Sequence, residues 1–331
     1  MSESLELDWK SLHGERFRGA RVLITGGAGF IGSHLSETLW KLGAQVVVID
    51  DLSGGSRENL KSFGPVEFNA GSILDRDLLA TCTRGCRYVF HQAALGSVPR
   101  SVEQPRLYND VNTTGTLNVL EAAREAKVAR VMFAASSSAY GSNPVPWIET
   151  MPPLPKSPYA ANKLAGEGLL RAWASSYSID TVSLRYFNIF GPRQNANSAY
   201  AAVIAAFASA LLKGRRPVIY GDGLQSRDFT FVANAVQANL LAAANEKPLA
   251  GEVINVGCGS RISVNELAAA MAAALGHPDL KPVHEPVRAG DILHSFADLK
   301  RAGELLRYKP IIGFQPGLEQ TLAWYKAVMP R

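Results

Sequence analysis

A tyrosine and a lysine lie four residues apart in "SPYAANKLAGEGLL", where Ser157 and Pro158 open a helix predicted near 159–177. Residues at this spacing share one helical face, so the Lys163 ammonium can lie beside the Tyr159 phenol. A free tyrosine titrates near pH 10, and reaching neutrality takes a shift of about 3 units, or roughly 4 kcal/mol of preferential stabilisation of the phenolate. Nearby positive charge supplies such stabilisation. The pair is therefore a candidate acid–base group, although the spacing alone also fits an ordinary helix surface.

A run of serines precedes this pair in the sequence. "AASSSAYGS" places Ser136, Ser137 and Ser138 directly after an apolar, strand-like run, and Ser136 lies 23 residues before Tyr159. Hydroxyl groups at the end of a strand either close a turn or donate hydrogen bonds to a reacting oxygen. On these residues alone both interpretations stay open.

A glycine array lies near the N-terminus. "VLITGGAGFIGSHL" puts Gly26, Gly29 and Gly32 immediately after a predicted strand and at the opening of a predicted helix. Glycines there allow a tight turn, a close approach of the backbone to a pyrophosphate and tight helix–sheet packing. The next strand, "VVVIDD", ends in Asp50, whose carboxylate can accept both hydroxyls of an adenosine ribose. Because an acid repels a 2′-phosphate, this pattern predicts NAD binding rather than NADP binding.

The elements that must position these residues follow a repeated order. Short β-rich runs alternate with helical stretches at roughly 20–30-residue spacing, which is typical of a parallel sheet with crossover helices. The strand-like runs are "RVLIT", "AQVVVID", "VEFNAG", "RYVFHQAA", "ARVMFAASS" and "DTVSLRYFNIF", with helices near 31–42, 75–83, 113–127 and 159–177. We therefore predict an α/β fold with a doubly wound parallel (Rossmann) sheet over 19–187, after an N-terminal extension over 1–18.

The sequence changes character after residue 191. Ala-rich helices are predicted near 199–213, 234–246 and 263–275 among short strands such as "PVIYG" and "EVINVG". Ser263 and Glu266 form a capping box that opens the last of these helices. We predict a smaller α/β lobe over 188–331, with part of 230–257 able to pack back on the first domain.

Several motifs together resemble the extended short-chain dehydrogenase/reductase family, over nearly the whole chain from Ala20 on. They are "TGGAGFIG", "HQAA", "NTTGTLNVLEAA", "SSSAYG", "SPYAANK", "RYFNIFGPR" and "SRDF". The resemblance implies that Tyr159 is the acid–base group, that Lys163 holds it and the nicotinamide ribose, and that Ser136 hydrogen-bonds the reacting oxygen. Ser137 and Ser138 are candidates to share the proton relay.

The resemblance also implies a set of NAD-binding residues. They are Gly26, Gly29, Phe30, Ile31, Gly32, Asp50, Ser72, Ile73, Gln92, Ala93, Ala94, Asn112, Tyr159, Lys163 and Phe187. One position departs from the family, which usually has Asp-Ile where this chain has Ser72-Ile73. The carboxylate that reads the adenine amine in the family is therefore missing here.

The second lobe resembles the half of the family that binds nucleotide sugars. The matching residues, which would hold a UDP-sugar, are Gly96, Ser97, Ser136, Asn188, Val203, Tyr220, Arg227, Arg288, Asp291 and Ser295. Two arginines suit a diphosphate because each offers several donors to phosphate oxygens. Ser295 stands where related galactose epimerases that exclude N-acetyl sugars carry a large tyrosine, so it leaves room beside C2 for an acetamido group.

The residues at the serine run separate the reactions of the family. Family dehydratases carry Asp-Glu directly after the serine or threonine, and family decarboxylases carry a Glu in the same segment, whereas this chain has Ser137-Ser138. The resemblance therefore implies an isomerase that oxidises C4 of the sugar to a ketone and reduces it on the other face. "HQAALGSVPRS", "GPRQNANSAYAAVI" and "GDILHSFAD" resemble bacterial UDP-N-acetylglucosamine 4-epimerases of surface-polysaccharide pathways.

Two alternatives stay open. One is a 4-epimerase of UDP-hexosaminuronate or UDP-glucuronate, and the other is a dinucleotide-binding sensor without catalysis. The intact Ser136, Tyr159 and Lys163 argue against the sensor.

Composition and charge bound the location and partners of the chain. The formal net charge is +5, and the cations are scattered among carboxylates, which suits an anionic small substrate and not nucleic acid. Cys82, Cys86 and Cys258 have no zinc or CxxC spacing, so we expect free thiols, no metal site and a cytoplasmic protein. The longest apolar run, "AYAAVIAAFASALL", is too short to span a membrane. The family resemblance implies a homodimer that pairs through the helices near 113–127 and 159–177.

Overall fold

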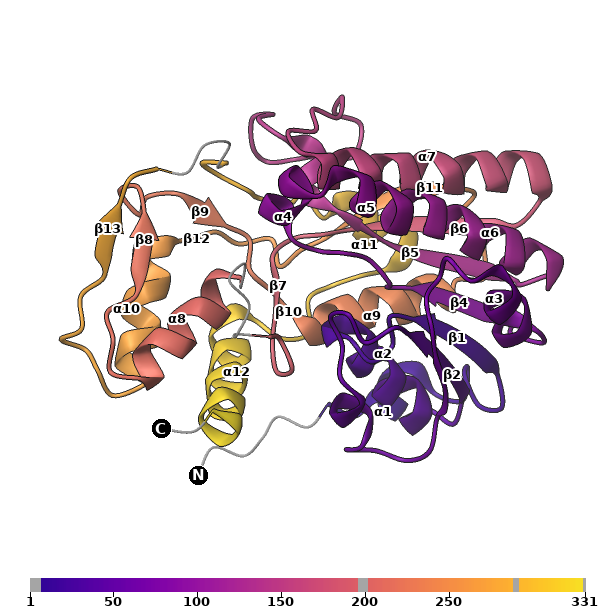
Figure 1. The fold of residues 1–331 in the computed structure, drawn as a ribbon, viewed down its shortest axis with the longest axis horizontal. Helices are drawn as coiled ribbons and strands as arrows, with labels where there is room; N and C mark the ends of the chain where they lie inside the picture. Colours follow the sequence, from indigo (N-terminus) through magenta and orange to yellow (C-terminus); the bar gives the residue numbers. More distant parts are fainter. Residues whose placement is uncertain (1–6, 196–201, 288–291, 330–331) are drawn as a thin grey trace.

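A seven-stranded parallel sheet forms the centre of the chain, of which the computed structural model describes residues 7–195, 202–287 and 292–329 (Figure 1). The strands are β1 (Arg21–Thr25), β2 (Gln45–Asp50), β3 (Glu67–Ala70), β4 (Tyr88–His91), β5 (Arg130–Ser136), β6 (Asp180–Tyr186) and β11 (Glu252–Val256). Their spatial order is β11-β6-β5-β4-β1-β2-β3, and every neighbouring pair is parallel. From β1 the strands follow one another as β1, β2 and β3 toward one edge of the sheet, and from β4 they follow as β4, β5, β6 and β11 toward the other edge. The predicted doubly wound sheet is thereby confirmed.

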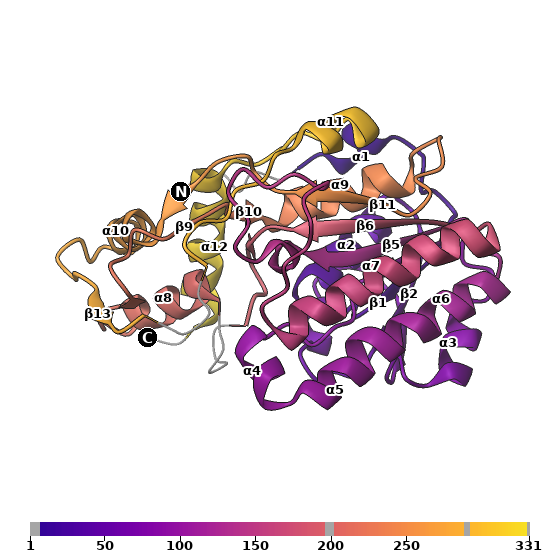
Figure 2. The same ribbon diagram turned by 90° about the horizontal axis from the view of Figure 1, so that it is seen from above.

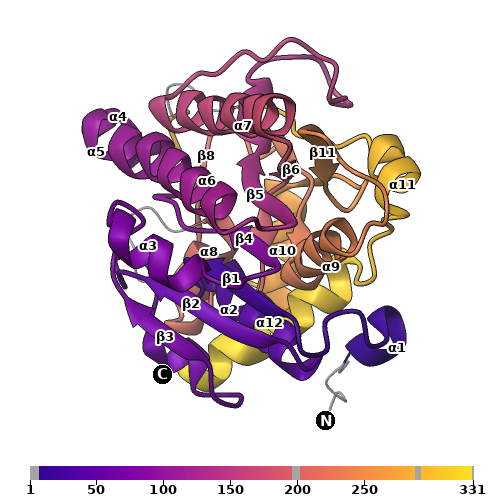
Figure 3. The same cartoon turned by 90° about the vertical axis from the view of Figure 1, so that its right-hand side faces the viewer.

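Helices cover both faces of this sheet (Figure 3). On one face lie α2 (Phe30–Lys41), α9 (Val232–Ala243) and α11 (Lys300–Leu306), and on the other lie α3 (Arg76–Thr83), α6 (Gly115–Glu125) and α7 (Pro158–Tyr177). The strands are apolar on both sides because both are covered. Val22 and Ile24 of β1 pack toward α2, whereas Leu23 between them packs toward α3 and α6.

Short elements surround the edge where the strands end. The 3₁₀ turn η1 (Arg57–Leu60) follows β2, and α4 (Val98–Glu103), α5 (Pro105–Asn109) and the π-helical turn η2 (Asp110–Thr114) join β4 to α6. The 3₁₀ turn η3 (Ser137–Tyr140) follows β5 directly. These turns bring loop residues to the carboxyl edge of the sheet.

A smaller lobe lies beside this edge (Figure 2). Its helices are α8 (Val203–Leu212), α10 (Val264–Ala274) and α12 (Phe314–Val328), and a shared apolar core holds them together. Three two-stranded sheets complete it: β8 (Val218–Tyr220) with β13 (Val283–Glu285), β9 (Ser226–Arg227) with β12 (Ile262–Ser263), and β7 (Ile189–Phe190) with β10 (Thr230–Phe231). The predicted capping box at the start of α10 is confirmed.

Three segments from outside 19–187 pack on the large sheet, namely α11, described above, and the two that follow. Inside 230–257, helix α9 packs against α2 and strand β11 pairs with β6. In the N-terminal extension, the short helix α1 (Trp9–His13) places the His13 ring against α9, where its Nε2 lies 2.8 Å from Oε1 of Gln237. No helix among the described ranges is long and apolar enough to cross a membrane.

Candidate active site

A cleft of about 550 Å³ follows the carboxyl edge of the sheet, where the strand order reverses between β1 and β4. Ligands of open α/β sheets bind at such a position. The predicted site residues that line this cleft are Gly26, Gly29, Phe30, Ile31, Gly32, Asp50, Ser72, Ile73, Gln92, Ala93, Ala94, Gly96, Ser136, Ser138, Tyr159, Lys163 and Asn188. The fold therefore brings together in one cavity residues that are widely separated in the sequence.

The turn between β1 and α2 has no room for side chains. Gly26 has φ +68°, and a Cβ on it would lie 2.8 Å from the backbone of Ala93. A Cβ on Gly32 would lie 2.1 Å from the Gly26 carbonyl oxygen. Gly29 is the N-cap of α2 and offers no side-chain cap, so the first N–H groups of the helix are presented to the cleft. This arrangement fits a pyrophosphate.

Asp50 ends β2 beside this turn. Its Oδ2 accepts a hydrogen bond from the Ala28 N–H at 2.9 Å, and its Oδ1 accepts one from the Leu52 N–H at 2.8 Å. Burial raises the pKa of Asp50, and these backbone donors oppose that shift. The carboxylate is thus fixed at the edge of the cleft with lone pairs left for a ribose, and the glycine turn and Asp50 together fit an adenine dinucleotide.

Helix α7 delivers the tyrosine and the lysine to the same cleft. The helix begins at Pro158, and Oγ of its N-cap residue Ser157 accepts a hydrogen bond from the Ala160 N–H. The Lys163 Nζ donates a hydrogen bond of 2.7 Å to the Ala134 carbonyl oxygen. It lies 5.9 Å from the centre of the Tyr159 ring. Burial lowers the pKa of Lys163 to about 7.

The serine run is both a turn and part of the cleft. Ser136 ends β5, and its Oγ accepts hydrogen bonds from the N–H and the hydroxyl of Ser138 at 3.2 and 2.8 Å. Burial raises the pKa of Tyr159, and a hydrogen bond with Ser136 opposes this shift. A phenol, an ammonium and a hydroxyl therefore converge on one point of the cleft. This constellation can take a proton from a sugar hydroxyl and return it.

Five predicted residues among those that the structure describes do not line either cavity of the site, namely Ser295, which is treated below, and the four that follow. Asn112 holds the loop after β4, because its side chain bonds both the N–H and the carbonyl oxygen of Leu95, at 2.8 and 3.1 Å. Ser97 caps α4, and Ser137 lies in η3 without lining the cleft. Phe187 is fully buried against Tyr140 and Trp147, so its side chain is not at the place expected for a nicotinamide contact.

A second cavity, of about 320 Å³, opens from the first into the small lobe. The predicted residues Asn188, Val203, Tyr220 and Arg227 line it, and the two cavities share Asn188, Ile189 and Gln194. A ligand can therefore extend from the sheet edge into the small lobe. Arg288 and Asp291, which were predicted to bind the nucleotide, lie outside the described residues.

Ser295 lies beside the junction of the two cavities. Its Oγ accepts a hydrogen bond of 2.9 Å from the Asn188 Nδ2, and the residue is 5% exposed. The Ser295 N–H donates to the Ser226 carbonyl oxygen at 3.0 Å. The small side chain is thus held against a residue that lines both cavities.

The sequence reasoning missed several cleft residues. Tyr186 lines the first cavity, where it donates to the Gln92 Oε1 at 3.2 Å and accepts from the Asn239 Nδ2 at 2.6 Å. Gln194 lines both cavities. Tyr186 lies in the quoted "RYFNIFGPR" and Gln194 in the quoted "GPRQNANSAYAAVI", and for Tyr186 the available signal was its polar hydroxyl at the end of a buried strand. Within the described ranges no group of three or more His, Cys, Asp and Glu side chains could hold a metal ion.

Known proteins resemble this chain along most of its length. Residues 22–257 match the model of the NAD dependent epimerase/dehydratase family. A UDP-glucose 4-epimerase of Mycolicibacterium smegmatis is 40% identical over 312 residues, which are 92% of this chain and 98% of that protein.

Two solved structures share the fold. A UDP-N-acetylglucosamine 4-epimerase of Methanobrevibacter ruminantium, in complex with UDP-N-acetylmuramic acid, has a TM-score of 0.90 at 40% identity, covering 94% of this chain and 100% of that one. A UDP-glucose 4-epimerase of Thermus thermophilus, in complex with NAD, has a TM-score of 0.84 at 37% identity, covering 93% and 100%. The predictions of family and NAD cofactor are thereby confirmed, and this chain belongs to the NAD-dependent epimerase/dehydratase family.

Proposed function

We propose that this enzyme interconverts UDP-N-acetylglucosamine and UDP-N-acetylgalactosamine by inverting C4 of the sugar. The coarser assignment, an NAD-dependent UDP-sugar 4-epimerase, follows from its relatives. The observation that supports the N-acetyl sugars is Ser295, a small, buried residue that is hydrogen-bonded to Asn188, and Asn188 lines both cavities. A small side chain there leaves space beside C2 of a sugar that bridges the cavities.

The residues of the cleft would carry the proton through this reaction. NAD, when bound along the glycine turn and Asp50, supplies the acceptor and donor of the C4 hydride. Tyr159 takes the proton of the C4 hydroxyl as the 4-ketone forms and returns it when the alcohol re-forms on the other face of the sugar. Ser136 donates a hydrogen bond to the reacting oxygen, and Ser138, bonded to Ser136, shares this role.

The neighbourhood of the serines favours epimerisation over other reactions of a 4-ketone. Elimination of water from C5 and C6 needs an added acid and base. The two positions after Ser136 hold only the hydroxyls of Ser137 and Ser138. Without an ionisable group there, the expected outcome is that the 4-ketone rotates in the site and is reduced on its other face.

A substrate panel tests the proposal. The purified protein is incubated separately with UDP-N-acetylglucosamine, UDP-N-acetylgalactosamine, UDP-glucose, UDP-galactose, UDP-glucuronate and a UDP-hexosaminuronate, and products are identified by NMR. We expect the two N-acetyl sugars to interconvert without added NAD if the cofactor copurifies. Preferred turnover of a uronate would contradict the proposal in favour of a uronate 4-epimerase. Binding of NAD with no product and no NADH absorbance from any sugar would instead indicate a sensor.

We further propose that the enzyme works in the cytoplasm as a homodimer and supplies sugars for surface polysaccharides. The free thiols of Cys82, Cys86 and Cys258 suit a reducing compartment. The outward side of α7 carries small exposed residues, Ala161, Ala165, Gly168 and Ala172. On neighbouring α4 and α5 the apolar side chains of Val102 and Leu107 are 64% and 40% exposed. A second copy packed on α6 and α7 would cover these groups.

A further inference from the structure

One turn beyond Lys163, helix α7 carries a buried carboxylate that the reaction described above does not use. Glu167 is 6% exposed, and its Oε1 and Oε2 accept hydrogen bonds from the Nε and Nη2 of Arg185 at 2.8 and 2.7 Å. Glu167 follows Lys163 by four residues, as Lys163 follows Tyr159, so the three side chains share one face of the helix.

The surroundings of Arg185 fix this ion pair in place. Arg185 lies on β6 directly before Tyr186, which lines the cleft. Its guanidinium carbon lies 4.5 Å from the centre of the Tyr140 ring, and the Tyr140 hydroxyl donates to the Asn255 Oδ1 at 2.7 Å. The carboxylate therefore cannot move away from Lys163 without breaking contacts on β6 and β11.

Stability alone is a weak reason for this pair. Removing two charges from water is costly, and replacing a buried ion pair by apolar side chains is often neutral or stabilising. Burial disfavours the charge of Arg185, but the hydrogen bonds and charge of Glu167 outweigh this effect, so the pKa of Arg185 is raised. A charge maintained at such a cost beside a catalytic lysine suggests an electrostatic role.

Lys163 is the group that this charge acts upon. It is 3% exposed, and its Nζ is held by the Ala134 carbonyl oxygen and lies 4.8 Å from the centre of the Phe133 ring. Burial lowers the pKa of Lys163 to about 7, and the charge of Glu167 opposes that shift. At neutral pH the lysine would otherwise give up its proton readily.

The other titratable groups near Lys163 supply no negative charge. Before NAD binds, Tyr159 on α7 is neutral because burial raises its pKa. The positive charges of Lys163 and of the bound cofactor would convert it to the phenolate that takes the proton. His91 on β4 is bonded to Thr25 and Thr116, and burial together with the charge of Lys163 lowers its pKa to about 3. Arg185 on β6 is a cation already paired with Glu167.

We propose that Glu167, held by Arg185, is a positioning residue that keeps Lys163 protonated in the cleft up to higher pH and so extends the activity of the enzyme to neutral pH. The direction of the effect on the pKa of Lys163 follows from the charges. Without the carboxylate, the ammonium of Lys163 loses its proton at lower pH, and with it the cation beside Tyr159. The inference rests on the epimerase activity proposed above, but the state of Lys163 can be measured without any substrate.

The first test is the pH dependence of kcat/KM in Glu167→Gln, which removes the charge and keeps an amide for Arg185. Profiles run from about pH 5 to about pH 10 with whichever UDP-sugar the wild type converts. We expect the alkaline limb of the kcat/KM profile to move to lower pH by about one pH unit, with kcat lowered above neutral pH and KM little changed. Glu167→Asp, which retains the charge, should restore the alkaline limb at least in part.

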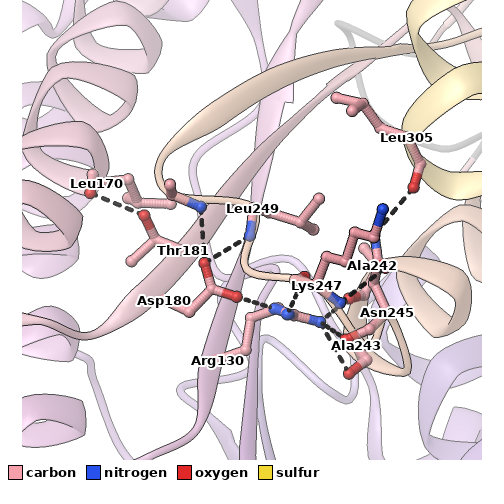
Figure 4. A network of polar contacts seen from close by, with 11 residues as sticks. Arg130, Leu170, Asp180, Thr181, Ala242, Ala243, Asn245, Lys247, Leu249 and Leu305 are labelled. Atoms are coloured by element: carbon pink, nitrogen blue, oxygen red, sulfur yellow. Dashed lines mark hydrogen bonds and ion pairs between the residues drawn. The ribbon is translucent and has the colours of Figure 1, made fainter.

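A matched control breaks another ion pair that involves strand β6. Asp180 at the start of β6 is paired with Arg130 of β5, at the opposite end of these strands from the cleft (Figure 4). Asp180→Asn should lower the melting temperature and leave the pH profile at its wild-type position. An equal displacement of the profile in Asp180→Asn would show a general effect of destabilisation and overturn the proposal.

The second test measures Lys163 directly in the protein without substrate. Lysines are labelled with ¹³C at Cε, the Lys163 signal is identified by its absence in Lys163→Arg, and its titration is followed by NMR. The midpoint should be lower in Glu167→Gln than in the wild type by the same shift as the kinetic limb. Equal midpoints would refute the role of Glu167 even if no sugar were turned over.

If Glu167→Gln does not fold, the double variant Glu167→Gln/Arg185→Gln takes its place, because it leaves no unpaired guanidinium. A smaller downward shift is expected there, because Glu167 is the charge that raises the pKa of Lys163 and the loss of the Arg185 cation partly offsets its removal. An unshifted midpoint in the double variant would likewise overturn the proposal.

Discussion

Ser136 has two hydrogen-bonding tasks in this structure. It closes the turn after β5 by accepting from the Ser138 N–H, and it shares hydrogen bonds with the hydroxyls of Ser138 and Tyr159. The sequence left the turn and the chemistry as alternatives, and the fold combines them. The reason is that the end of a parallel strand is both the place for a turn and the place where a ligand binds.

The three serines are predicted to differ in alanine scans. Ser136→Ala removes the partner of Tyr159 and should lower kcat by about 10²-fold or more, because a donor to the reacting oxygen is lost. Ser138→Ala should cost less, and Ser137→Ala should be close to wild type because Ser137 does not line the cleft. Turnover of UDP-sugars measured by NMR checks the order. Tyr159→Phe, expected to lose about 10²–10⁴-fold, is the reference for a lost proton acceptor.

A result in which Ser137→Ala is the most damaged variant would contradict this assignment of the serines. Wild-type turnover in Tyr159→Phe would contradict the proton transfer itself.

Ser295 is predicted to select between sugars. Ser295→Tyr should suppress turnover of the N-acetyl sugars and spare UDP-glucose and UDP-galactose, because a phenol beside Asn188 would fill the space next to C2. Ser295→Ala is the matched control: it removes the same hydrogen bond without adding volume and should retain the N-acetyl sugars. The ratio of kcat/KM values for acetylated and plain sugars is the measurement. Equal loss on all four sugars in Ser295→Tyr would refute a selective role.

At the scale of elements, caps and periodicity predicted the helices that carry the site. The helix predicted near 159–177 is α7 over 158–177, because Ser157 and Pro158 define its start. The two-residue strands β9, β10 and β12 were not predicted as strands, and β7 was predicted only as the end of the single run "DTVSLRYFNIF". Each exists only because a distant segment pairs with it, as Ser226–Arg227 does with Ile262–Ser263.

Asp228, between β9 and β10, ties this part of the chain to two distant segments and gives a prediction about stability. Its carboxylate accepts from the N–H groups of Cys258, Gly259 and Ala297 at 2.8, 3.1 and 3.3 Å. An amide has one acceptor oxygen and points a donor at the remaining N–H groups. Asp228→Asn should therefore lower the free energy of unfolding by about 1–3 kcal/mol, measured by urea denaturation.

The difference in free energy of unfolding between wild type and Asp228→Asn should change with pH in a definite direction. Burial raises the pKa of Asp228 to about 6, above its unfolded value of 3.8, so the folded state binds the extra proton between these values. Stability from this group is lost as pH rises from about 4 to about 6. The difference in free energy of unfolding between wild type and Asp228→Asn should accordingly become smaller over this pH range. A difference that becomes larger would contradict the raised pKa.

Arg130 ties the end of α9 to the sheet (Figure 4). Its Nη1 donates to the carbonyl oxygens of Ala243 and Asn245 at 3.2 and 2.9 Å, and its Nη2 donates to that of Lys247 at 2.9 Å. Arg130→Met should destabilise the protein by about 3–5 kcal/mol, because Asp180 and these carbonyls lose their partner. Calorimetry checks the loss. At temperatures where the variant is folded, kcat should be unchanged, and a selective loss of kcat would contradict a purely structural role.

At the scale of the whole molecule, function depends on how two cavities meet. Sequence motifs predicted residues of both cavities, yet Gln194, which lines both, was not among them. The junction exists only because the loop after β7 runs between the sheet edge and the small lobe, where the Tyr325 hydroxyl of α12 donates to the Gln194 carbonyl oxygen at 2.8 Å. Local patterns along the sequence hold no information on that packing.

The proposed dimer is the prediction that belongs to this scale. Two copies packed through α6 and α7 would place Ala165 against its counterpart, where a charged side chain cannot be hydrated. Ala165→Glu should therefore be monomeric at micromolar concentration, whereas the wild type and Ala269→Glu, which adds the same charge at an exposed position on α10, should be dimers. Light scattering with size-exclusion chromatography measures the masses. A monomeric wild type would contradict the dimer, and a dimeric Ala165→Glu would place the interface on another surface.

Because Ala165 follows Lys163 on α7, loss of the partner is also expected to loosen the helix that holds Tyr159 and Lys163, so turnover should fall with dilution through the dimer dissociation constant.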